Sequence, residues 1–171
     1  MSALSWEDLF VDARRLDFVA MLAEWGGLVS GPIRPIGASV FGDLFFERQT
    51  GEVEKLDVLE GGVHRVAASF DEFTVLMNSV EWQAQHLLSE GVALLKDRGL
   101  SRGAGQFFGF APHPMLAGKV VWSLAMPLDF IVWNSICAQL LASPPTPTPD
   151  SMGSGDGAKR SWWQRFRRRS S

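Results

Sequence analysis

The chain has 171 residues, of which 46% are hydrophobic, so it is long enough to form one domain with its own core. A single cysteine, Cys137, excludes an internal disulfide and favours a reducing compartment. The net charge is −3, and the charges are unevenly distributed along the chain. Residues 143–171 contain six basic and two acidic residues, whereas residues 1–142 contain ten basic and seventeen acidic residues. An acidic body argues against specific nucleic-acid binding and favours basic partners.

The chain carries no recognisable export or membrane signal. Glu7, Asp8 and Asp12 interrupt the segment in which a signal peptide would need an apolar run. The longest apolar candidate, residues 130–142, has 13 residues, whereas a membrane span needs about 20. We therefore expect a cytoplasmic protein in which Cys137 is a small buried side chain.

Helical signals open the chain. Ser5, with Glu7 and Asp8 behind it, is typical of a helix start, because its hydroxyl can cap a free amide and the acids favour the positive end of the dipole. Apolar residues then recur at helical spacing from Leu9 to Trp25, with a break near residues 14–17, and two glycines end the pattern.

A three-stranded antiparallel meander is predicted next. Residues 30–35 are expected to form a loop, and the strands are predicted over residues 38–48, 53–59 and 63–68, with turns at residues 49–52 and at Gly61-Gly62.

The second half alternates helices and strands. Helices are predicted over residues 70–78, capped by Ser69, over 80–98, capped by Ser79, and over 130–141, capped by Asp129; strands are predicted over 106–110 and 119–124.

Composition changes after Ala142. Residues 143–158 are rich in proline, serine and glycine, which predicts a flexible linker, and residues 159–171 form a basic tail with aromatic residues. The expected organisation is one α+β domain over residues 1–142, an antiparallel sheet flanked by helices, followed by a disordered linker and the tail.

No catalytic or metal-binding pattern is found. The three histidines, His64, His86 and His113, fall on different elements, and neither a nucleophile elbow nor a phosphate-binding loop is present. The adjacent Asp71 and Glu72 are better explained by helix capping than by acid–base catalysis. We expect no enzyme activity, no cofactor, no metal and no small-molecule substrate.

The predicted hairpin carries a run of carboxylates, and two interpretations stay open. These side chains either form a solvated edge that discourages strand pairing or a surface that docks a basic protein. The candidate docking residues are Glu47, Glu52, Glu54, Asp57 and Glu60. Three tryptophans near element ends, Trp25, Trp82 and Trp122, are either core residues or interface anchors.

Two stretches together resemble a known family. The first, residues 33–56, contains Phe41, Gly42 and Asp43 within a Phe-Gly-Asp-Leu-Phe strand. The second, residues 91–141, contains Phe108, Gly109 and Phe110, then Gly118 and a last apolar helix. Their order and spacing are similar to those of Tdi-type immunity proteins of type VI secretion systems and of the related GAD-like domains. Phe108 stands where the family has tyrosine, Ala117 where it has the first of two glycines, and a Glu-Asn pair is missing near Trp122.

The resemblance implies a small protein that binds and blocks a cognate toxin, in the best-known type a DNase. The motif residues are expected to be structural, with glycines that permit close packing or unusual backbone angles.

The tail allows a second function, a peripheral membrane adaptor. Its aromatic and basic side chains could rest on an anionic membrane surface, touch nucleic acid or another protein, fold back on the acidic body, or contact nothing. They are Trp162, Trp163, Arg165, Phe166, Arg167 and Arg168.

Overall fold

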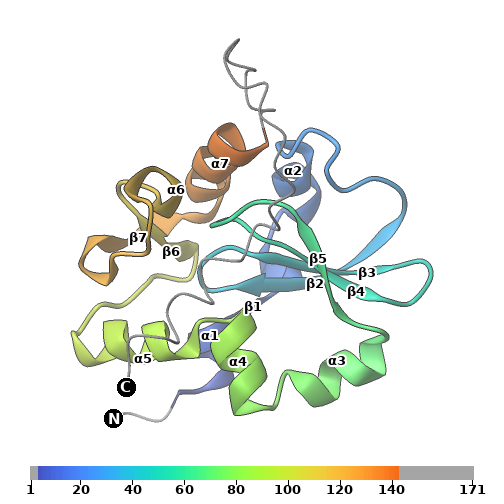
Figure 1. Ribbon diagram of the computed structural model, residues 1–171, viewed down its shortest axis with the longest axis horizontal. Coiled ribbons are helices and arrows are strands. Elements are labelled where there is room, and N and C mark those ends of the chain that lie inside the picture. Colours follow the sequence, from blue (N-terminus) through green and yellow to red (C-terminus); the bar gives the residue numbers. More distant parts are fainter. Residues whose placement is uncertain (1–3, 143–171) are drawn as a thin grey trace, which may run out of the picture.

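Five consecutive strands pair in the order in which they occur in the chain, and this antiparallel sheet is the centre of the molecule (Figure 1). The computed structural model describes residues 4–142. A separate two-stranded sheet and a set of short helices complete the fold, which confirms the predicted α+β class. The predicted linker, 143–158, and the tail, 159–171, lie outside the described residues.

The main sheet is longer than the predicted meander. Its strands are β1 (Phe10–Asp12), β2 (Ile33–Ser39), β3 (Leu44–Arg48), β4 (Val53–Leu56) and β5 (Val63–Ala67). The single strand predicted over residues 38–48 is wrong: a tight turn centred on Val40-Phe41, closed by the hydrogen bond from the Gly42 amide to the Ser39 carbonyl, divides it into β2 and β3. Gly42 has a φ of +101°, which a residue in a continuous strand does not adopt. Part of the predicted loop at residues 30–35 belongs to β2.

The helical stripe predicted from Leu9 to Trp25, with its break near residues 14–17, is wrong for residues 10–12, which form a strand, and is confirmed as a helix over Phe18–Ala23. The chain forms α1 (Trp6–Leu9), strand β1, a 3-10 turn η1 (Ala13–Arg15) and α2 (Phe18–Ala23). Phe10 pairs with Ser39 and Val11 with Ala38 on the edge of the sheet, and both apolar side chains become buried there. The backbone hydrogen bonds offered by that edge outweigh the local helical periodicity. The predicted break is where Asp17 caps α2.

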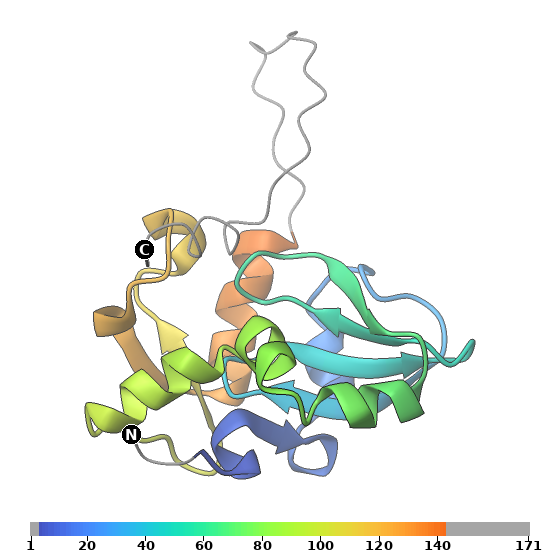
Figure 2. The same cartoon turned by 60° about the horizontal axis from the view of Figure 1, so that its bottom comes forward.

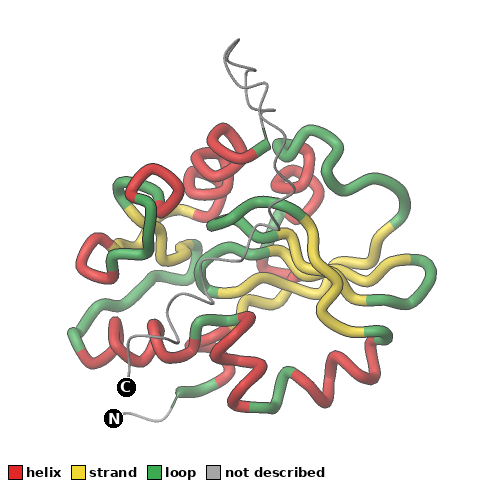
Figure 3. The backbone as a smooth tube through the Cα atoms, in the orientation of Figure 1, coloured by secondary structure: helices red, strands yellow, loops and turns green. Residues whose placement is uncertain are grey.

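Three helices follow the sheet and form a row along one side of it (Figure 3). They are α3 (Phe70–Leu76), α4 (Val80–His86) and α5 (Ser89–Asp97), so the helix predicted over residues 80–98 is divided at Leu88, whose φ is +54°. Consecutive residues of a helix point about 100° apart. The break allows Leu87 and Leu88, which are neighbours, both to be buried. Ser69 and Ser79 cap α3 and α4 as predicted.

The last third of the chain forms the second sheet and the longest helix. Its elements are β6 (Gln106–Phe110), α6 (Pro114–Ala117), the 3-10 turn η2 (Trp122–Leu124), β7 (Ala125–Asp129) and α7 (Phe130–Leu141). The strand predicted over residues 119–124 is displaced to residues 125–129, which pair with β6. Trp122 instead packs against Phe41 and Phe110, with ring centroids 5.8 Å from each. Asp129 caps α7 as predicted.

Helix α7 joins the two sheets and lies between them in Figure 2. The Trp133 indole donates a hydrogen bond to the carbonyl oxygen of Phe41 at 2.7 Å. Asn134 accepts one from the Trp25 indole and donates one to the Met21 carbonyl, both at 3.0 Å, which fixes α2 to α7. Cys137 is fully buried, as predicted, and burial raises the pKa of its thiol.

Close packing around Trp133 requires a residue without a side chain at position 109. A Cβ atom added to Gly109 would lie 2.5 Å from Leu128 Cδ1 and 2.7 Å from Trp133 Cε3. We predict that Gly109→Ala lowers the free energy of unfolding by about 2 kcal/mol in urea denaturation, because the core must shift to admit the methyl group. Gly105→Ala, where a Cβ meets nothing within 4 Å, is the matched control and should change stability by less than about 0.5 kcal/mol. Equal effects would contradict the packing argument.

Candidate functional site

The residues of the two family-like motifs meet at one place, the turn between β2 and β3. The Phe108 amide of β6 donates to the Val40 carbonyl at 2.8 Å, and the Phe41 ring lies 6.0 Å from the rings of Phe108 and Phe110. A Cβ atom on Gly42 would lie 3.1 Å from Trp133. Gly118 has a φ of +73° and ends α6. The motif residues of the turn and of β6 therefore hold the two sheets together, whereas Gly118 is an exposed residue at the end of α6 and takes no part in this junction.

Asp43 is the charged member of this turn, and its carboxylate is buried. One oxygen accepts from the Val58 amide at 2.9 Å and the other from the Ser39 hydroxyl at 3.0 Å. The Ser39 hydroxyl oxygen in turn accepts from the Asp43 amide at 3.1 Å. Burial raises the pKa of Asp43 to about 6, opposed by the nearby positive charge of Lys55.

A buried ion pair lies beside Asp43. Lys55 Nζ is 3.0 Å from the Asp57 carboxylate, and both side chains are almost inaccessible to solvent. The pairing lowers the pKa of Asp57 against the effect of its burial, and Asp57 also accepts from the Leu59 and Glu60 amides. Lys55 lies in β4 and Asp57 follows the end of that strand, so their spacing of two residues was the available signal for this pair. The prediction that Asp57 belongs to a docking surface is wrong, because its carboxylate points inward to Lys55.

Two histidines lie near this buried cluster. His113 donates from Nε2 to the Val58 carbonyl at 2.9 Å and accepts from the Met115 amide at Nδ1. His86 packs against Trp82 with the ring planes tilted and the centroids 4.8 Å apart, and burial, aided by the positive charge of Lys55, lowers the pKa of His86 to about 4. Within residues 4–142 no three His, Cys, Asp or Glu side chains gather in a way that could hold a metal ion.

The remaining hairpin acids are mostly balanced by neighbouring arginines. Glu47 pairs with Arg34, and Glu54 lies 2.6 Å from Arg48. Glu52 and Glu60 are half-buried, and Glu60 makes an interaction of its own. The structure thus presents this hairpin as a surface of mixed charge rather than as an acidic one.

An acidic surface without ion pairs lies instead on the helices α3 to α5, where the guanidinium of Arg34 from β2 approaches the start of α3, 4.5 Å from the Phe70 ring. Residues 66–95 contain four acids and no lysine or arginine, so the sequence itself carries the signal for this surface. All four acids are exposed, and none forms an ion pair with another described residue. We call this the acidic helix surface, formed by Asp71, Glu72, Val75, Val80, Glu81 and Glu90. Its two valines are each 73% exposed, which adds apolar area between the charges.

A second surface is apolar. Seven of the twelve large hydrophobic side chains that are exposed within residues 4–142 occur between positions 115 and 136, on α6, η2, β7 and α7. The most exposed of them is Leu116, at 67%. Trp25 and Trp82 are buried, so the interpretation of these two as interface anchors is wrong, and Trp122 is partly buried against Phe41.

The tail residues Trp162, Trp163, Arg165, Phe166, Arg167 and Arg168 lie outside the described part of the chain. Among residues 4–142 no helix combines the length and the apolar character needed to cross a bilayer.

Comparison with known proteins identifies a shared fold. No protein-family model and no curated protein matches the chain. Among solved structures, the chain is similar to Atu4351 from Agrobacterium tumefaciens, with a TM-score of 0.57 and 17% sequence identity. The match covers 78% of this chain and 68% of that chain. At this identity the likeness shows the fold alone.

We predict that Lys55→Met destabilises the protein by about 3 kcal/mol, because it leaves the Asp43 and Asp57 carboxylates buried without their cation. The matched control is Arg14→Met, which removes a cation from an ion pair whose arginine side chain is 88% exposed. That change should leave the midpoint of the same urea titration nearly unchanged, because solvent screens an exposed ion pair. A Lys55 variant as stable as the control would show that the buried pair contributes nothing.

We also predict that His86 makes the protein less stable in mild acid. Its stabilising contribution is fully present above its unfolded pKa of 6.5 and is lost as the pH falls through its folded pKa of about 4. Asp43 has the opposite effect on the pH dependence. Its folded pKa of about 6 lies above the unfolded value of 3.8, so the stability it contributes is present below pH 3.8 and is lost as the pH rises through about 6.

The substitution His86→Gln retains Asp43, so comparison of the two proteins isolates the histidine. From about pH 8 to about pH 5, the unmodified protein should lose roughly 2 kcal/mol more unfolding free energy than the variant. The measurement is urea denaturation at each pH, and parallel pH profiles would exclude this role.

Proposed function

We propose that this protein is a non-enzymatic immunity protein that neutralises a type VI secretion toxin by forming a stoichiometric complex with it. The resemblance of residues 33–142 to Tdi-type immunity proteins supports this function, and its motif residues, apart from Gly118, are buried. The partner must therefore dock on side chains outside the motifs.

The acidic helix surface is the observation that carries the proposal. Its four carboxylates have no neighbouring lysine or arginine in residues 66–95, so their field extends into solvent. Val75 and Val80 provide apolar contact in the same surface. A nuclease must carry positive charge to bind its substrate, and complementary charge accelerates association and selects partners. Docking a basic nuclease on this surface would cover the cationic groups that bind nucleic acid.

The decisive experiment is co-expression with the product of the adjacent gene, followed by co-purification at low and high salt. We expect a one-to-one complex that suppresses the toxicity of that product and weakens as salt rises, because exposed charges are screened. Absence of a complex, with toxicity unchanged, would overturn the proposed function.

Charge reversal locates the docking surface. Asp71→Lys combined with Glu81→Lys should weaken the complex by at least about tenfold, measured by calorimetry, because two attractive contacts become repulsive. Glu52→Lys on the hairpin is the matched control and should leave affinity nearly unchanged. Loss of binding in Leu116→Glu alone would move the docking site to the apolar surface of residues 115–136 while leaving the immunity function standing.

A further inference from the structure

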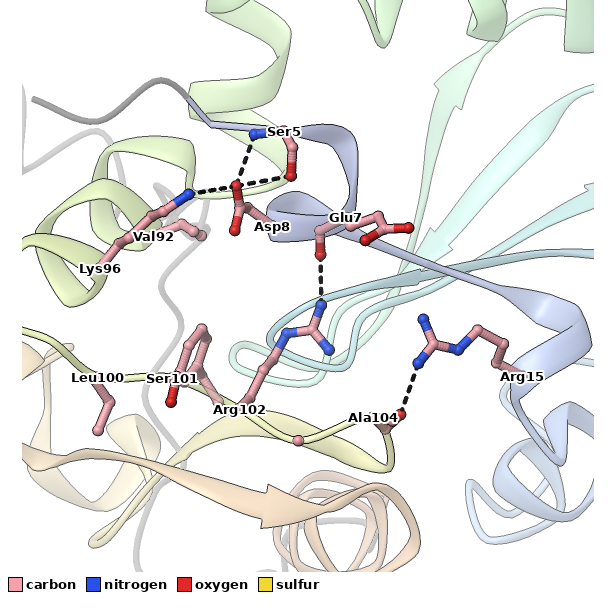
Figure 4. A pocket seen from close by; sticks show the side chains of 12 residues that line it. Ser5, Glu7, Asp8, Arg15, Val92, Lys96, Leu100, Ser101, Arg102 and Ala104 are labelled. Atoms are coloured by element: carbon pink, nitrogen blue, oxygen red, sulfur yellow. Dashed lines mark hydrogen bonds and ion pairs between the residues drawn. The ribbon is translucent and has the colours of Figure 1, made fainter.

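A pocket of about 330 Å³ lies between α1, α5 and the loop before β6, away from the buried charge cluster (Figure 4). Segments distant in the sequence build it: the N-terminal helix, the end of α5, the loop of residues 100–104, and Arg15 from η1. Its volume is in the range of small-molecule sites. Three cationic side chains line it, Arg15, Lys96 and Arg102.

The three cations differ in how they are neutralised. Lys96 Nζ lies 2.8 Å from Asp8 Oδ2. The same carboxylate oxygen accepts a hydrogen bond from the Ser5 amide at 2.7 Å. Arg15 and Arg102 form no ion pair with any described residue. Both arginines therefore keep their positive charge without a carboxylate partner in contact.

Backbone carbonyls hold the two guanidinium groups in place. Arg102 donates to the Glu7 carbonyl at 2.7 Å and to the Gln106 carbonyl at 3.2 Å, and Arg15 donates to the Ala104 carbonyl at 3.2 Å. Figure 4 shows the two groups facing each other, with Glu7 presenting its backbone oxygen rather than its carboxylate to Arg102. Each guanidinium has five N–H groups, so donors remain for a ligand. The pKa of Arg102 is lowered by burial and then by the positive charge of Arg15.

We propose that this pocket binds the phosphate monoester group of a small molecule between Arg15 and Arg102. Near pH 7 a monoester carries close to two negative charges, so the two guanidinium groups attract it more strongly than a singly charged carboxylate. The Glu7 and Asp8 carboxylates of the lining influence Arg102 without contacting its guanidinium group. Its oxygens suit the paired donors of arginine. Val92, Leu100 and Phe108 line the same pocket and would contact the apolar part of the ligand.

A small molecule fits this site better than a nucleic-acid backbone. The first 142 residues carry ten basic and seventeen acidic residues, and this acidic body repels a polyanion more strongly than it repels a small molecule with a single phosphate group. The diester of a nucleic acid also carries only one charge per phosphate, which leaves the pair of arginines half balanced.

The test uses the full chain and phenyl phosphate, with benzoate as the singly charged ligand that has the same ring. Isothermal calorimetry at low ionic strength should show saturable one-to-one binding of phenyl phosphate, at least about tenfold tighter than benzoate. Arg15→Gln and Arg102→Gln should each weaken it by at least about tenfold. Arg14→Gln, which changes the adjacent arginine outside the pocket, should have no effect.

Arg15 is exposed, so its variant keeps the test valid if Arg102→Gln fails to fold. No saturable binding of phenyl phosphate, or equal affinity in Arg15→Gln and the unmodified protein, would overturn the proposal. An oligonucleotide without terminal phosphate that bound more tightly than phenyl phosphate would overturn it as well, by identifying the pocket as a backbone site. These outcomes do not depend on complex formation with a toxin.

Discussion

The arrangement of the molecule depends on the short turn between β2 and β3 and on the carboxylate buried behind it. Asp43 ties this turn to the end of β4 through the Val58 amide. The turn also accepts hydrogen bonds from Trp133 of α7 and Phe108 of β6. An isolated carboxylate would be costly in this interior, but directed hydrogen bonds and the Lys55 cation compensate for its burial. One turn thereby sets the position of both sheets and of the helix between them.

This placement separates the features that define the fold from those that can select a partner. Phe41, Gly42, Phe108 and Gly109 are interior residues of the junction, so a resemblance based on them concerns architecture. The exposed side chains of α3 and α4 lie outside that junction and tolerate changes in charge without disturbing it. A family of toxin-binding proteins built in this way could keep its core while its helix surface changes with the partner.

Charge is distributed along α5 in a way that links the two proposed sites. Its first turn carries exposed Glu90, part of the acidic helix surface, whereas Lys96 near its end lines the pocket with Arg15 and Arg102. The pocket is cationic even though the body of the protein is acidic, because the arginines are held by backbone carbonyls rather than by carboxylates. On the two proposals, a basic protein would dock near one end of this row of helices and an anionic small molecule would bind near the other.

By itself, the sequence determined the elements that have local causes: the helix starts at Ser69, Ser79 and Asp129, the strand at residues 106–110 and the α+β class. Tertiary structure decided the elements that depend on distant partners. Residues 10–12 became a strand because a sheet edge was free, and the helix broke at Leu88 because two adjacent leucines had to be buried. The same holds for the charged side chains, whose positions no local pattern encodes. Burial turned Asp57 inward to Lys55, and tertiary packing brought Arg15 and Arg102 together in one pocket.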